Sequence, residues 1–72
     1  MSSECPGKTS WPELVGSDGN DAASVIESQN PGVKAVVILD GSPVTGDFRC
    51  DRVWVRVDKE VDGIVVQVPT VG

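Results

Sequence analysis

Two apolar runs, residues 33–39 and residues 53–57, are separated by the stretch 41–50, whose sequence is Gly-Ser-Pro-Val-Thr-Gly-Asp-Phe-Arg-Cys. Both runs are rich in β-branched residues and predict strands. Most connections in a compact domain are shorter than this stretch, and longer ordered loops often carry function. Pro43 fixes one φ angle, and Val44 and Thr45 are stiff because they are β-branched. The stretch therefore predicts a loop displayed for insertion into another protein, although an ordinary connection fits the spacing equally well.

The 72 residues are expected to form one domain, residues 1–72, whose core is too small to be secure. Such a chain usually needs a staple. A Cys5–Cys50 disulfide would contribute about 4 kcal/mol in the chain-entropy model. The alternative is two reduced thiols, because the first residues contain no apolar secretory segment. Small size favours the bridge, which in turn favours an oxidising, extracellular or vacuolar compartment, while the compartment itself stays unknown.

The composition argues against several classes of function. The net charge of −5 argues against a nucleic-acid partner, which needs clustered lysines and arginines. No apolar run approaches the length of a membrane span. The chain has no histidine, so a Ser-His or Cys-His nucleophile cannot be assembled and a structural zinc set is incomplete. We therefore expect no enzyme, no metal and no cofactor.

A helix is predicted between Asp18 and Gln29. Asp18 is a suitable N-cap, with Asp21 three residues later as a weak capping box. Positions 22, 25, 26 and 29 follow helical spacing, and the sequence Asn-Pro-Gly at 30–32 ends the helix. Trp11 could be a binding aromatic, but a lone tryptophan in so small a protein is expected in the core.

The strand patterns differ from one another. The run 33–39 is almost continuously apolar, which is typical of a strand covered on both faces, often an internal parallel strand. Residues 52–58 alternate cleanly, with the valines at 53, 55 and 57 on one face. Residues 64–68 are predicted to form a last strand that ends at Pro69. One helix packed on one small sheet, an α+β fold, is the simplest arrangement of these elements.

Two segments begin like known ligand-binding motifs and then depart from them. Gly41 and Gly46 have the glycine spacing of a phosphate-binding loop, but Asp47 stands where lysine is required. Residues 58–63 begin like a calcium loop, yet the twelfth position is Pro69 rather than glutamate. We interpret both segments as turns.

The other face of residues 52–58 carries Arg52, Trp54 and Arg56. It could be a solvated face on which an arginine stacks on the tryptophan. Alternatively, a strand that leaves a long loop runs back beneath it, so that Arg52 can point into the loop. There it could hydrogen-bond the loop carbonyls, Thr45 and the Asp47 carboxylate, and make the loop rigid before a partner arrives.

The chain resembles the potato inhibitor I family of serine protease inhibitors, most closely its plant members with a single disulfide. The resemblance covers essentially the whole chain. The segments that carry it are Cys5-Pro6-Gly7-Lys8, Ser10-Trp11-Pro12-Glu13-Leu14-Val15-Gly16, Asn30-Pro31, Gly41-Ser42-Pro43-Val44-Thr45, Asp47-Phe48-Arg49-Cys50-Asp51-Arg52-Val53 and Val68-Pro69. The resemblance implies one helix packed on a small mixed β-sheet, with the two long strands parallel and a long exposed binding loop.

The resemblance also implies roles for individual residues. The scissile bond would be Gly46–Asp47, and Cys5 and Cys50 match the family's disulfide. Arg52 matches one of two basic residues that support the loop from below, and Trp54 stands where many members have the second. The protease-binding loop comprises Pro43, Val44, Thr45, Gly46, Asp47 and Phe48.

Gly46 departs from family members that block trypsin or chymotrypsin, which carry a basic or bulky apolar residue there. The resemblance therefore implies a monomeric inhibitor, of the plant-defence type, of subtilisin-like or elastase-like serine proteases that accept small residues. It would act by a substrate-like mechanism. The alternative is a member whose inhibition is weak or lost and which serves as a storage or interaction protein.

Overall fold

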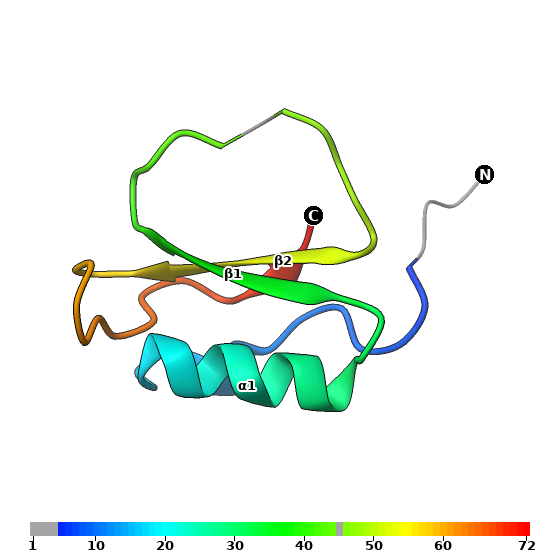
Figure 1. The fold of residues 1–72 in the computed structure, drawn as a ribbon, viewed down its shortest axis with the longest axis horizontal. Coiled ribbons are helices and arrows are strands. Elements are labelled where there is room, and N and C mark those ends of the chain that lie inside the picture. Colours follow the sequence, from blue (N-terminus) through cyan, green and yellow to red (C-terminus); the bar gives the residue numbers. More distant parts are fainter. Residues whose placement is uncertain (1–4, 45) are drawn as a thin grey trace.

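The computed structural model describes residues 5–44 and 46–72. Within them, a short 3₁₀ helix η1 precedes the α-helix, and three strands follow (Figure 1). The bounds are η1 Pro12–Leu14, α1 Gly19–Gln29, β1 Lys34–Leu39, β2 Arg52–Val57 and β3 Thr70–Val71. In this part of the chain, no helix is both long enough and apolar enough to span a lipid bilayer.

The sheet is mixed, with strand order β1-β2-β3. β1 and β2 are parallel, in a register that runs from Lys34 opposite Arg52 to Leu39 opposite Val57. β3 is antiparallel to β2, with Val71 opposite Val53. The predicted class, one helix packed on a small mixed sheet, is confirmed.

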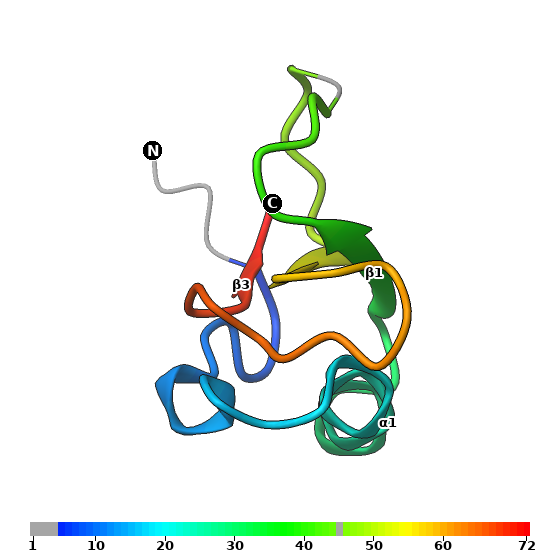
Figure 2. The same ribbon diagram turned by 90° about the vertical axis from the view of Figure 1, so that its left-hand side faces the viewer.

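The connection between β1 and β2 is long because the two strands are parallel. The chain leaves β1 at one end of the pair and must enter β2 at the other end, so it has to cross the full length of the strands. A helix usually makes such a crossing. Here residues 40–44 and 46–51 form an arch on one side of the sheet, while α1 lies on the other side (Figures 1 and 2).

The core fills the space between the sheet and α1. Trp11 is completely buried, as predicted, and its Nε1 donates a hydrogen bond to Gln29 Oε1 at 2.9 Å. The three valines of β2 predicted to share a face all lie in this core. The buried apolar side chains are Trp11, Leu14, Ala22, Ile26, Val33, Val53, Val55, Val57, Val65 and Val71.

Both ends of α1 follow the sequence signals. The Asp18 carboxylate accepts hydrogen bonds from the backbone N–H groups of Asn20 and Asp21, at 3.0 and 3.1 Å, as an N-cap does. Asn30 caps the other end, and its own buried side chain donates Nδ2 to the carbonyls of Pro6 and Lys8. The helix terminus thereby fastens the N-terminal segment.

The prediction that residues 33–39 form a strand covered on both faces is wrong in one respect. The strand is parallel to its neighbour, but β1 lies at the edge of the sheet and none of its six residues is fully buried. α1 packs against one face, and the other is on the side of the arch. An apolar run indicates a strand. It does not show that both faces of the strand are buried, because a single α-helix can pack against only one of them.

The prediction of a last strand over residues 64–68 is also wrong. Val65 makes an isolated bridge with Val57, Val66 and Val68 are exposed, and the strand that joins the sheet is β3, beyond Pro69. Proline cannot donate to a strand ladder. After it, the Val71 N–H bonds the Thr9 carbonyl, so β3 lies between β2 and the N-terminal segment.

Gly63 is expected to be intolerant of a side chain. An added Cβ there would run into the Lys59 carbonyl oxygen and lie 2.7 Å from Val57 Cβ. Overpacking of this kind costs about 1–3 kcal/mol, so Gly63→Ala should lower the melting temperature by at least about 5 °C. Gly46→Ala is the matched control, because a Cβ at Gly46 meets nothing within 4 Å. Equal melting temperatures for the two variants would contradict this packing.

Candidate functional site

The arch is attached to the sheet at its first residues. The Asp40 N–H donates to the Val57 carbonyl at 2.7 Å, and the Ser42 N–H donates to the Leu39 carbonyl at 3.0 Å. Gln67 Nε2 also donates to Asp40 Oδ1 at 2.7 Å. The chain therefore leaves β1 in a fixed direction.

The predicted protease-binding residues lie together on the exposed part of the arch. Pro43, Val44, Gly46, Asp47 and Phe48 are all exposed, and 58% of the Phe48 surface is accessible. The Phe48 ring is therefore accessible to a partner. Thr45, the remaining predicted residue, lies outside the described residues.

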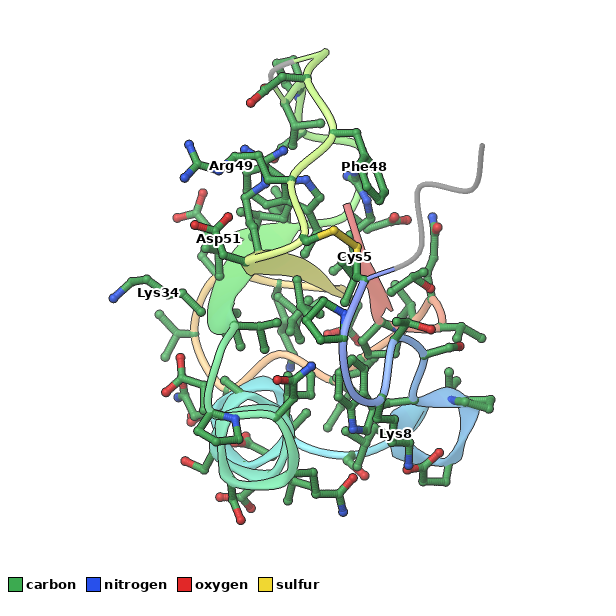
Figure 3. All side chains as sticks on the ribbon, turned by 90° about the vertical axis from the view of Figure 1, so that its right-hand side faces the viewer. Cys5, Lys8, Lys34, Phe48, Arg49 and Asp51 are labelled. Carbon is green, nitrogen blue, oxygen red and sulfur yellow. A yellow bond between two sulfur atoms is a disulfide. The ribbon has the colours of Figure 1, made fainter. Side chains whose placement is uncertain are left out.

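A disulfide fastens the base of the arch on the side where it enters β2. Cys5 and Cys50 are bonded, with their Cα atoms 5.2 Å apart, as predicted (Figure 3). Cys5 also packs against the buried core. The bond therefore connects this end of the arch to the N-terminal segment, which is itself fastened by Asn30.

Arg52, the first residue of β2, reaches into the arch. Its Nη2 donates to the Asp47 carbonyl at 2.7 Å, and its Nε donates to the Gly72 carbonyl at 2.8 Å. Nη1 also lies 3.7 Å from Asp47 Oδ2. The Arg52 side chain is 14% exposed and that of Asp47 53%, so a largely buried cation holds an exposed residue of the arch.

The Trp54 side chain stacks on that of Arg52. The guanidinium carbon of Arg52 is 4.6 Å from the centre of the Trp54 ring. Each sequence-based alternative for this face holds in part: the arginine stacks on the tryptophan and also points into the arch, but Arg52, Trp54 and Arg56 are half-buried rather than solvated. A cation–π contact of this kind limits the directions that the guanidinium can take.

Arg49 is turned toward Asp51, on the other side of the arch from Phe48 (Figure 3). Its Nε and Nη2 donate to the two Asp51 carboxylate oxygens, each at 2.9 Å. These hydrogen bonds lower the pKa of the Asp51 carboxyl and raise that of Arg49. The side chain of Arg49 is thus engaged at the base of the arch.

Two hydrogen bonds made by the arginines of β2 were not predicted from the sequence. One is the Arg52 bond to the Gly72 carbonyl, and the other is a hydrogen bond from Arg56 Nη1 to the Ser42 carbonyl at 3.3 Å. The second had a signal, since Arg56 shares its strand face with Arg52. Among the described residues, no group of three or more histidine, cysteine or acidic side chains could hold a metal ion.

The sequence profile of the potato inhibitor I family matches residues 3–72. The chain belongs to this family. A relative from Cucurbita maxima, named as an inhibitor of trypsin and Hageman factor, is 56% identical over 97% of this chain and all of its own. A trypsin/subtilisin inhibitor from Amaranthus caudatus is also 56% identical, over 94% of this chain and 96% of its own.

The fold agrees with that of a solved member of the family. The crystal structure of bitter gourd trypsin inhibitor superposes with a TM-score of 0.88, at 57% identity, covering 97% of this chain and all of the other. The family predicted from the sequence is therefore confirmed. The predicted class of protein, a protease inhibitor, is the class to which these relatives belong.

The disulfide should matter for both the fold and the arch. The bridge closes a loop with a sequence separation of 45, worth about 4 kcal/mol in the chain-entropy model. The paired variant Cys5→Ser/Cys50→Ser should therefore melt at least about 15 °C below the parent. Its arch should also be cleaved faster by an added protease. A reducing agent should lower the melting temperature of the parent and speed its cleavage, and it should change neither in the paired variant. A parent whose melting temperature and cleavage rate are the same with and without the reducing agent would contradict this role.

Proposed function

We propose that this protein is a serine protease inhibitor that presents the Gly46–Asp47 bond to its target in the manner of a substrate. The observation that carries the proposal is the contact of Arg52 with the Asp47 carbonyl at 2.7 Å, beneath residues that are themselves exposed. Exposure makes the bond available to an active-site groove. The contact from below limits the movement of the residue that follows the bond.

The arrangement supports slow cleavage followed by resealing. Hydrolysis of Gly46–Asp47 adds one water and leaves a carboxylate on Gly46 and an amine on Asp47. Arg52 would still hold Asp47, and the Cys5–Cys50 bond would still hold the base of that limb. If both new ends stay in place, condensation with loss of water is favoured over release. A loop ordered in advance also loses little entropy on binding.

Gly46 points to targets that accept small residues in their primary pocket, namely subtilisin-like or elastase-like enzymes. Glycine places no side chain in that pocket, which leaves the affinity for trypsin or chymotrypsin low. One relative at 56% identity is named for trypsin and subtilisin together. The proposal requires no cofactor and no second copy of the chain.

A second candidate is a family member with weak inhibition that serves for storage or interaction. Two features favour it. Gly46 has more backbone freedom than any other residue would have at the proposed reactive bond. Trp54 offers one N–H where many members have a guanidinium with five donors.

Titration against a small panel of proteases separates the two candidates. We expect subtilisin and pancreatic elastase to lose activity stoichiometrically as the protein is added, and trypsin and chymotrypsin to retain most of theirs at the same ratio. Mass spectrometry of the protein recovered from subtilisin should find cleavage at Gly46–Asp47 and no other early site. Full activity of all four enzymes, or rapid cleavage elsewhere, would favour the storage candidate.

Gly46→Lys should convert the protein into a trypsin inhibitor. Nothing lies within 4 Å of a Cβ at this position, so the scaffold should accept the new side chain without refolding. Lysine supplies a cation for the carboxylate in the trypsin pocket and removes the extra backbone freedom of glycine. A central, desolvated anchor is commonly worth about 2 kcal/mol or more, so trypsin affinity should rise by at least about thirtyfold.

The matched variants for this test are Gly46→Ala and Gly46→Leu. The alanine variant controls for backbone freedom alone, and the leucine variant should favour chymotrypsin instead. Inhibition constants for the parent and the three variants against both enzymes make the comparison. If the folded variants all keep the parent's constants, Gly46 does not occupy the primary pocket and the assigned bond is wrong.

A further inference from the structure

Arg56 lies beneath the half of the arch opposite to the one that Arg52 holds. In the register of the sheet, Arg52 is paired with Lys34 and Arg56 with Ile38, so the two arginines lie toward opposite ends of the parallel pair. Four residues along a strand span about 13 Å. The arch begins where β1 ends, at Leu39 opposite Val57, and returns to the sheet where β2 begins, at Arg52. Each arginine therefore has a different limb of the arch within reach.

The side chain of Arg56 is directed toward the first limb of the arch, the part that precedes the Gly46–Asp47 bond. Its Nη1 donates to the Ser42 carbonyl at 3.3 Å, and the side chain is partly buried. It lines an open hollow of about 220 Å³ together with Trp54, Gln67 and the last residues of the chain. The aliphatic part of a partly buried arginine packs on such walls and so limits where its charged end can lie.

We propose that Arg56 is a second support of the arch, a positioning residue that orders the limb before the reactive bond as Arg52 orders the limb after it. The inference rests on the proposed function. It also accounts for the departure at position 54, because the tryptophan there stacks on Arg52 while a basic side chain two residues further along the same face reaches the arch. The basic supports are thereby spread over both limbs.

The two supports should differ in strength. The Arg52 bond to Asp47 measures 2.7 Å, and the Arg56 bond to Ser42 measures 3.3 Å, which is slightly longer than the usual N–H···O hydrogen bond of about 2.7–3.2 Å. Loss of the Arg56 bond should therefore have the smaller effect. After cleavage of Gly46–Asp47, however, the first limb is no longer joined to the limb that Arg52 holds. The order of the first limb then depends on contacts of its own, including the one with Arg56.

The test compares Arg56→Met and Arg52→Met, in which the apolar length of the side chain is kept and its donors are lost. Each variant is incubated with a catalytic amount of subtilisin until the ratio of cleaved to intact protein is constant, starting from either form. We expect Arg56→Met to raise this ratio about fivefold and Arg52→Met to raise it further. Arg56→Lys keeps a charge and a donor and should recover part of the change.

Backbone ¹⁵N relaxation of the free protein gives a readout that needs no protease. Arg56→Met should lower the order parameters of the Val44 and Gly46 amides and leave that of the Phe48 amide unchanged. In Arg52→Met, the order parameter of the Phe48 amide should fall most. Lys59→Ala is the matched control, since it removes a positive charge from the exposed turn beyond β2. It should change neither the order parameters nor the ratio.

The outcomes separate the two proposals. If subtilisin neither binds nor cleaves the parent at Gly46–Asp47, the proposed function fails, and the relaxation data still decide whether Arg56 orders the first limb. If folded Arg56→Met keeps the parent's Val44 and Gly46 order parameters, the second support is overturned. It is also overturned if Arg56→Met loses order equally at every amide, since a general loosening of the fold would produce that result.

Discussion

The parallel pairing of β1 and β2 is the constraint on which the rest of the structure depends. It places the end of one strand and the start of the next at opposite ends of the sheet. The two strands therefore cannot be joined by a short hairpin turn, and the chain must cross the length of the sheet. With α1 already on the other face, the crossing chain has only the outer face of β2 and its flanks to rest on. A long exposed arch is the result.

β2 links the stability of the fold to the order of the arch through its alternation. Val53, Val55 and Val57 are buried against α1, and the residues between them face the arch. The valines fix the height and direction of the strand, and therefore the positions from which the arginines reach upward. An arginine on a well-packed strand loses less entropy on forming its hydrogen bonds than one on a mobile loop. For this reason a small core can still hold a precise arch.

Much of this could be predicted from local sequence signals, and the misses have a common cause. The ends of α1 and the alternation of β2 depend on neighbouring residues, so Asp18 and the residues after Gln29 were sufficient to place them. The place of β1 at the sheet edge, the choice of 70–71 as the last strand and the contact of Arg56 with Ser42 depend on distant partners. A pattern of residue types does not contain that information.

The contacts that hold the arch are separate from the exposed side chains that the arch carries. Arg52 and Arg56 contact backbone carbonyls, at Asp47 and Ser42, so their hydrogen bonds do not depend on which side chains those residues carry. A Cβ at Gly46 meets nothing within 4 Å, so that residue places no demand on the scaffold either. Under the proposed function, a change of side chain at position 46 can therefore alter the affinity for a given protease pocket without disturbing the contacts of Arg52 and Arg56. In this chain the glycine leaves the backbone at that position more freedom than any other residue would. Under the two proposals, Arg52 and Arg56 then have to supply more of the order that a substrate-like inhibitor needs.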